Sequence, residues 1–259
     1  MTQAEILYRH NQQPRQGLAL AGALFGVKAI LLIPHLIILG ALASLAYNVG
    51  YVGFWITAFT GKFPVGLQNL ISMWLRWSAR SYGWLAGVTD QYPPFEPEPE
   101  GFPIDAQTPV NTNPSKGWAV AGIFVIPKAI CAVPHLLLLA FVMIAVIAVT
   151  WVGYLVTFFT GKFPTGMQDF IAGTMQWYTR VMSWFLGLTD EYPPYGVDIR
   201  PAACGPLSRS GGRGRGVRAS AISRADGRGR GERASALSRA DGRGRGERAS
   251  AISRADGRG

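Results

Sequence analysis

Two long runs of uncharged, mostly apolar residues dominate the pattern of hydrophobic and polar positions along the chain. No formally charged side chain occurs between Lys28 and Lys62, or between Lys128 and Lys162. Each run is longer than the ~20 apolar residues that cross the ~30 Å hydrocarbon core of a bilayer. A signal peptide does not explain both runs, because the second lies in the middle of the chain. The pattern therefore predicts two transmembrane helices.

The pattern occurs twice, because residues 17–95 align with residues 117–195 at a constant shift of one hundred positions, without a gap. An internal repeat of this kind decides the architecture of a chain. The repeated motifs lie where a helix is expected to bend, turn or stop. They are Pro34 and Pro134, Gly61 and Gly161, Pro64 and Pro164, and Tyr92 and Tyr192. The sequence predicts two tandem copies of one membrane domain.

Each repeat is expected to form three helical pieces. Pro34 and Pro134 remove a backbone donor, so they kink or break the helix in which they lie. A glycine C-cap followed by a proline in the next first turn favours a sharp reversal, and hence an antiparallel hairpin. The expected pieces are residues 18–33, 35–59 and 65–88 in the first repeat and residues 118–133, 135–159 and 165–188 in the second.

The third piece of each repeat is amphipathic, with polar residues every three or four positions. It either lies in the membrane interface with its polar stripe in water, or crosses the membrane with the stripe buried, where charges must pair. In the second case the stripe forms a polar seam between the repeats, made by Arg76, Arg80, Asp169 and Arg180. Four crossings also keep both termini on the cytoplasmic side, as the positive-inside tendency prefers. We favour the spanning alternative.

Three further segments surround the repeats. They are a polar leader at residues 1–16, an acidic, proline-rich linker at residues 96–116, and a tail rich in Arg and Gly at residues 196–259. We expect the linker to be extended and solvated, because Pro lacks an N–H donor and like charges repel. The tail has too little apolar surface to fold alone, so it is predicted to be disordered.

The basic balance of the chain comes from this tail. Residues 205–259 contain fourteen Arg and five acidic residues, whereas residues 1–204 contain eleven basic and ten acidic residues. Arg beside a membrane attracts anionic lipid, and such a segment also binds RNA without sequence preference. A recently expanded DNA repeat with no selected role explains the tail equally well. Because the charge is not on a folded face, it does not indicate nucleic-acid recognition by the folded part.

Taken together, these patterns predict an all-α integral membrane protein that is multi-pass in the plasma membrane. Its fold is a tandem repeat of helical hairpins. Two long, kinked transmembrane helices are accompanied by two amphipathic helices that span the membrane or lie in its interface, and a disordered tail follows.

Lys28 and His35, with their counterparts Lys128 and His135, are the candidate site for a lipid head group or a proton, since ionisable residues at membrane depth often mark function. The alternative is a lysine that extends to the interface and a neutral histidine that bonds a carbonyl freed by the adjacent proline. No cysteine or carboxylate accompanies the histidines at ligand spacing, so neither a metal site nor a cofactor is expected.

Three blocks in fixed order resemble the bacterial domain of unknown function 4389 family. In the first repeat they are residues 33–36 (Ile-Pro-His-Leu), residues 59–64 (Phe-Thr-Gly-Lys-Phe-Pro) and residues 89–95 (Thr-Asp-Gln-Tyr-Pro-Pro-Phe). The resemblance covers both repeats but neither leader nor tail. It implies a small integral membrane domain, often tandem, and supplies no catalytic residue or cofactor.

Three classes of function follow. A non-catalytic membrane scaffold or accessory subunit, bound to the bilayer and to a membrane partner or a second copy, agrees with the absence of a nucleophile–base pair. A small transporter or lipid-handling protein would use the polar seam, because paired repeats are common in transporters. An enzyme using His35 and His135 ranks last, because no carboxylate or nucleophile lies near them in the sequence.

Overall fold

The computed structural model describes residues 3–24, 26–99 and 101–197, which belong to one compact unit, Met1–Ser208. Nearly all of the tail expected at residues 196–259, including Cys204, lies outside the described residues. The elements in chain order are β1 (Glu5–Tyr8), α1 (Gln16–Ala23), α2 (Val27–Thr60), α3 (Val65–Leu85), β2 (Ile104–Gln107), α4 (Lys116–Ile123), α5 (Ile126–Thr160) and α6 (Thr165–Phe185). The described part of the chain is mostly helical, as expected, with two short strands that the prediction of an all-α fold did not include.

Neither Pro34 nor Pro134 ends the helix in which it lies. Helix α2 continues through Pro34 and α5 continues through Pro134, whereas the short helices α1 and α4 end earlier, at Ala23 and Ile123. The break before α2 falls at Gly26, whose φ of 110° is a conformation that glycine adopts without a steric penalty. The position of the break therefore follows backbone conformation rather than the proline.

The hydroxyl of Tyr92 lies beside the turn of α2 that contains Pro34, where it donates to the carbonyl oxygen of Leu31 at 2.8 Å. In the second repeat Tyr192 donates to the carbonyl oxygen of Cys131 at the same distance. A proline inside a helix leaves a donor missing, and neighbouring side chains often satisfy the carbonyls around it. The Tyr-Pro-Pro motif that closes each repeat thus returns to the kinked turn of the long helix.

Tight turns join each long helix to its amphipathic partner. Gly61 and Gly161 end α2 and α5 with φ values of 71° and 69°, a left-handed conformation typical of a helix C-cap. Pro64 and Pro164 occupy the N-cap positions of α3 and α6. Close packing also requires glycine in the long helices, since a Cβ on Gly53 would lie 2.3 Å from the ring of Phe63.

The register of the two strands reflects the internal repeat. β1 and β2 are antiparallel, and Ile6 lies opposite Ala106, its own counterpart one hundred residues later. On either side of this pair, Glu5 lies opposite Gln107 and Leu7 lies opposite Asp105. A shift of one hundred residues relates Glu5 to Asp105 and Leu7 to Gln107, so it converts one of these pairs into the other. The register therefore has two-fold symmetry, which is what a ribbon built from two equivalent segments requires.

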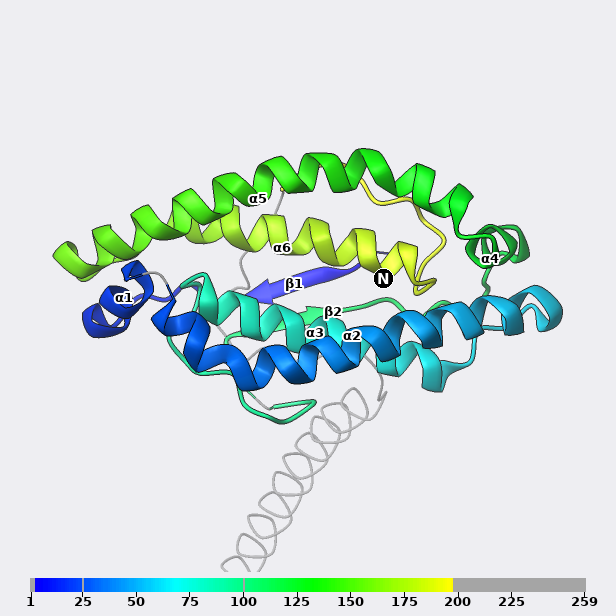
Figure 1. Ribbon diagram of the computed structural model, residues 1–259, viewed down its shortest axis with the longest axis horizontal. Helices are drawn as coiled ribbons and strands as arrows, with labels where there is room; N and C mark the ends of the chain where they lie inside the picture. The colour runs from blue at the N-terminus through cyan, green and yellow to red at the C-terminus, as the bar shows by residue number, and fades with distance from the viewer. Residues whose placement is uncertain (1–2, 25, 100, 198–259) are drawn as a thin grey trace, which may run out of the picture. The chain divides into compact units, whose positions relative to one another are not determined.

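The N-terminal arm of each repeat packs on the other repeat. β1 contacts α6 and α1 contacts α5, whereas β2 contacts α3 and α4 contacts α2. Figure 1 shows the two strands between the α2–α3 hairpin and the α5–α6 hairpin. The repeats therefore interlock through a reciprocal exchange of arms, and the chain is not two independent domains in a row.

The second half of the linker is not solvated. Phe102, Ile104 and Ala106 are buried, and the Thr108 hydroxyl donates to the Ser72 hydroxyl on α3 at 2.7 Å. The expectation of an extended, solvated linker is wrong for this half, because alternate apolar residues of a strand all face the same side. In the leader, Ile6 and Tyr8 are buried in the same way. The strand ribbon covers the polar sides of α3 and α6.

In the described part of the chain, α2 and α5 are the two helices that are long and apolar enough to cross a membrane. Only 22% of the most apolar window of each helix is buried in the protein. Large apolar side chains point outward along both helices, including Ile37, Phe59, Phe141 and Ile144. By contrast, α3 and α6 are largely buried between the long helices and the ribbon.

Candidate functional site

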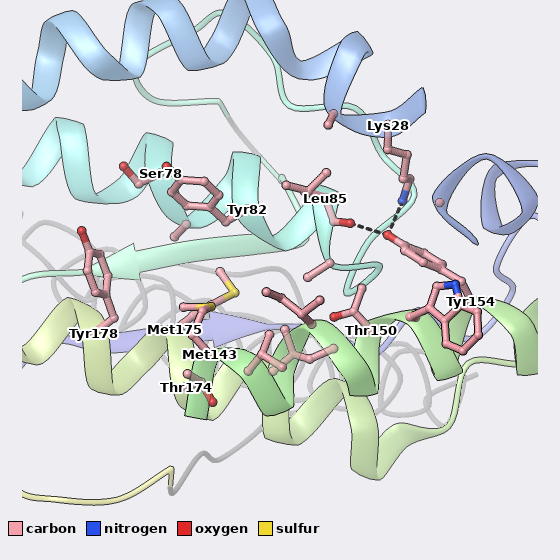
Figure 2. Close-up of a pocket in the computed structure, with 18 of the residues that line it drawn as sticks. Lys28, Ser78, Tyr82, Leu85, Met143, Thr150, Tyr154, Thr174, Met175 and Tyr178 are labelled. Carbon is pink, nitrogen blue, oxygen red and sulfur yellow. Dashed lines mark hydrogen bonds between the residues drawn. The ribbon is translucent and has the colours of Figure 1, made fainter. Parts of the chain in front are cut away.

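A cavity of about 500 Å³ lies between the two repeats, within the size range of small-molecule sites. Its walls come from α3, α5 and α6, and the start of α2 forms one end (Figure 2). Most of the lining is apolar, but hydroxyl groups and one ammonium also face it. The polar lining residues are Lys28, Ser78, Tyr82, Thr150, Tyr154, Thr174, Tyr178 and Thr179.

Lys28 lies at the α2 end of the cavity. Its side chain is 2% exposed, and its Nζ donates to the carbonyl oxygen of Trp84 and to the hydroxyl of Tyr154, both at 2.9 Å. The Tyr154 hydroxyl in turn donates to the carbonyl oxygen of Leu85, so a chain of hydrogen bonds crosses from α2 through α5 to α3 (Figure 2). The ammonium also lies 4.8 Å from the centre of the Trp84 ring, at a distance typical of a cation–π contact.

Lys128 occupies the equivalent position in the second repeat. Its Nζ donates to the carbonyl oxygens of Trp184 at 3.0 Å and Phe185 at 3.2 Å. The ring of Phe54 lies 4.2 Å from the ammonium and takes the place that Tyr154 has beside Lys28. Each lysine therefore joins the two repeats at one end of the fold, but only Lys28 has a tyrosine hydroxyl as a partner.

Two cavity-lining positions carry larger side chains in the other half of the repeat pair. In the equivalent space beside α2, Trp74 takes the place of Thr174, and Leu186 takes the place of Ala86. Leu186 packs closely on α2, since its Cδ2 lies 3.2 Å from where a Cβ on Gly50 would be. A comparison of small and large residues between the two copies could have found this asymmetry from the sequence.

His35 is not part of the Lys28 end of the cavity. Its Nδ1 accepts a hydrogen bond from the indole N–H of Trp77 at 2.9 Å, and its ring stacks on Phe95 with centroids 4.0 Å apart. His135 repeats this geometry with Trp177 at 3.0 Å and Tyr195 at 4.0 Å. A histidine that accepts at Nδ1 carries its proton on Nε2. Each ring is neutral and held within an aromatic cluster.

The expected polar seam is divided among separate partners. Arg76 pairs with Glu98 at 3.0 Å, and Arg80 donates to the carbonyl oxygens of Glu96 and Pro97 at 3.2 and 3.0 Å. Arg180 donates to the carbonyl oxygen of Ala4 at 3.1 Å. The polar stripes of α3 and α6 therefore face the linker and the leader. These bonds of Arg76, Arg80 and Arg180 do not join one stripe to the other.

Asp169 joins a cluster that the sequence did not indicate. It accepts hydrogen bonds from the hydroxyl of Tyr8 and, at 2.8 Å, from Nε2 of His10. Burial of the phenol, followed by its hydrogen bond to Asp169 and the charge of that residue, raises the pKa of Tyr8 above its ordinary value. The leader residues had no periodic signal, because the role of Tyr8 depends on contact with a residue 161 positions later in the chain.

In residues 3–24, 26–99 and 101–197, no three His, Cys, Asp or Glu side chains lie together in a way that could hold a metal ion. The ionisable side chains that the sequence singled out instead bond other segments of the chain, as Lys28, His35 and Asp169 show. The arrangement combines a mostly apolar cavity lining with one buried ammonium at its end.

The model of a protein family described as "Domain of unknown function (DUF4389)" matches residues 24–96 and 124–195, which is more than half of the chain. The resemblance found in the sequence is thereby confirmed for both repeats. No match is found among curated proteins or among solved structures. The matched ranges contain the long helices, their amphipathic partners and the Tyr-Pro-Pro motifs, but not the strands, α1 or α4. The chain therefore belongs to the family of this domain of unknown function and contains two tandem copies of the domain.

Proposed function

We propose that this protein is a non-catalytic integral membrane protein that acts as a scaffold or accessory subunit. The observation that carries the proposal is the outward-facing apolar surface of α2 and α5. Only 22% of the apolar window of each helix is buried, whereas a core helix of a soluble protein is mostly buried. An apolar surface of this extent marks contact with a membrane or a partner.

The polar groups on this surface support contact with hydrocarbon. The hydroxyl of Ser44 donates to the carbonyl oxygen of Gly40 at 3.1 Å, and the amide of Asn48 donates to the carbonyl oxygen of Ser44 at 2.7 Å. On α5 the Thr160 hydroxyl bonds the carbonyl oxygen of Val156 at 2.7 Å. In lipid such groups need partners inside the protein, and these three find them one turn earlier in their own helix.

The position of the ribbon favours the interfacial alternative for α3 and α6. β2 and the segment that follows it run along α3, with contacts from Gly83 to Ile104 and from Gln68 to Asn111. Because α3 packs along α2, a crossing of both helices would take the exposed Glu5 of the ribbon to bilayer depth. We infer that the ribbon faces water and that α2 and α5 are immersed in the apolar layer.

The contacts of the titratable side chains support a non-catalytic role. The Nδ1 lone pairs of His35 and His135 are occupied by indole N–H groups, so these atoms are not available as general bases. Arg76 and Arg80 bind the linker. A transporter that uses the seam gains no support from these contacts, because they tie the polar stripe to the linker and leader.

Membrane fractionation and cysteine labelling test the proposal. The chain should stay with membranes in alkaline carbonate and be released by detergent. In a background without Cys131 and Cys204, cysteines at Ile37 and Ile144 should resist a water-soluble maleimide until detergent is added, and a cysteine at Glu5 should react in vesicles open on its side. Release by carbonate alone, or rapid labelling at Ile37 and Ile144, would contradict membrane insertion.

The scaffold role needs a separate measurement. The full chain, purified in mild detergent after crosslinking in membranes, should carry a defined partner or a second copy of itself. A protein that remains monomeric and partner-free under these conditions would contradict the scaffold role, although membrane insertion would stand.

A further inference from the structure

We propose that the cavity between the repeats binds one long-chain carboxylate, with the acyl chain between α3, α5 and α6 and the carboxylate at Lys28. This inference rests on membrane insertion, because the bilayer supplies the ligand. Three observations carry it: the chemistry of the cavity, the access route along α5, and the larger core residues at two equivalent positions in the other half of the molecule.

The Lys28 end is suited to an anion. The ammonium bonds two neutral oxygens, from Trp84 and Tyr154, although it has three donors. Asp90, whose charge acts on Lys28, itself accepts a hydrogen bond from the backbone N–H of Arg15 at 2.5 Å. The first turn of α2 also lies here, with Gly26 as its N-cap, so free backbone N–H groups and the positive helix end favour a carboxylate.

The middle of the cavity is suited to a hydrocarbon chain. Figure 2 shows Met143 and Met175 in its centre, between the Lys28 end and the end marked by Tyr178. Methionine side chains are flexible and polarisable, so they adapt to an irregular apolar ligand. A polar solute would leave most of its hydrogen bonds unmade in such surroundings.

The cavity opens beside the surface proposed to face lipid. Met143, Ile147 and Trp151 line it, and all three are also among the exposed large apolar residues of α5. An acyl chain can therefore enter from the bilayer along α5 without passing through water. A water-soluble anion would lack the apolar contacts that make up most of the lining.

The environment of Lys128 in the other half of the molecule can be compared directly with that of Lys28. Lys128 has the same burial and the same type of carbonyl partners as Lys28, but in this half the larger residues Trp74 and Leu186 pack in the core at the positions equivalent to Thr174 and Ala86. A single molecule of ligand per chain follows from this difference. The same comparison supplies substitutions that fill the cavity with residues that the fold already accepts at equivalent positions.

Native mass spectrometry of the full chain in detergent, titrated with hexadecanoate and with hexadecanol, tests the proposal. The wild type should bind one hexadecanoate, and bind it more tightly than hexadecanol. Lys28→Met should weaken hexadecanoate binding about tenfold or more, the loss expected for a charge-assisted hydrogen bond, and leave hexadecanol nearly unchanged. Lys128→Met, the matched control, should retain the preference for the carboxylate.

Two cavity-filling variants keep the test decisive if Lys28→Met fails to fold. Thr174→Trp and Ala86→Leu each copy the counterpart in the other half, and each should reduce binding of both ligands about tenfold or more, since the chain loses its apolar contacts. Leu138→Trp, on the exposed surface of α5 and outside the cavity, should bind as the wild type does.

Several outcomes would overturn the proposal. They are equal binding of the acid and the alcohol, equal effects of Lys28→Met and Lys128→Met, unchanged binding by both cavity-filling variants, and binding of phosphatidylglycerol in place of hexadecanoate. Carbonate extraction of the same variants separates these results from a failure of membrane insertion. A chain that resists carbonate but does not bind hexadecanoate would contradict the cavity site alone.

Discussion

The side chain of Gln68 holds the backbone of Asn111, forty-three residues later in the chain. Its Oε1 accepts from the Asn111 N–H at 2.7 Å, and its Nε2 donates to the Asn111 carbonyl oxygen at 3.0 Å. Gln168 holds Asn11 in the same way, at 2.8 and 3.3 Å. Each glutamine thus fixes the arm that comes from the other repeat.

Replacing these glutamines should loosen the exchange of arms. Gln68→Ala leaves the buried backbone groups around Asn111 without their partners, which costs about 1–3 kcal/mol. Gln168→Ala should have a similar effect through Asn11. Thermal unfolding in detergent measures both. Asn69→Ala, next to Gln68 but exposed, is the control and should unfold like the wild type. An equal loss of stability in Asn69→Ala would show that the contact with the arm is not the cause.

Close packing in the long helices gives a second prediction. Gly53→Ala places a Cβ 2.3 Å from the ring of Phe63, so overpacking should reduce stability by about 1–3 kcal/mol. Gly40→Ala in the same helix meets nothing within 4 Å. It should be neutral or raise stability by up to about 1 kcal/mol, because alanine favours a helix. Reversal of this order in denaturation experiments would contradict the helix packing described here.

The histidine cluster predicts a defined tautomer. His35 accepts at Nδ1 from Trp77, so side-chain ¹⁵N NMR should find its proton on Nε2 at neutral pH. Trp77→Phe removes the donor and should reduce stability by about 1 kcal/mol. Trp55→Phe changes an exposed indole on α2 and should leave both the tautomer and stability unchanged. A proton found on Nδ1 of His35 in the wild type would rule out the indole bond.

The leader cluster predicts a pH dependence. Tyr8 donates to Asp169, and its pKa is raised in the folded state. The neutral phenol therefore stabilises the fold below about pH 10, where the unfolded phenol begins to ionise, and this contribution is lost as the pH rises further. Tyr8→Phe should cost about 1–3 kcal/mol at pH 7.

The stability difference between the wild type and Tyr8→Phe should shrink above pH 10. Chemical denaturation at several pH values measures it. Tyr51→Phe, which changes an exposed tyrosine on α2, is the control for the substitution itself and should unfold like the wild type at pH 7. A constant difference between wild type and Tyr8→Phe up to pH 11 would contradict the predicted linkage.

Much of the helical part could be read from the order of residues. The repeat, the two apolar runs and the reversals at Gly61 and Gly161 depend on local composition and on backbone preferences, so they could be predicted from the sequence. A head-group or proton site at Lys28 and His35 stays a prediction. Both are buried as part of the interior, but Trp84 and Trp77 from another helix hold them in different surroundings.

By itself, the sequence determined that the chain has two tandem copies of one domain, each with a long apolar helix and a glycine-capped turn, because an apolar run and a capped turn need only neighbouring residues. The tertiary structure alone decided that the arms exchange, that β1 pairs with β2, and that α3, α5 and α6 line a cavity between the repeats. These features arise from contacts across about one hundred residues or more, such as Tyr154 with Lys28. Their energies depend on which side chains meet, and no local pattern encodes that.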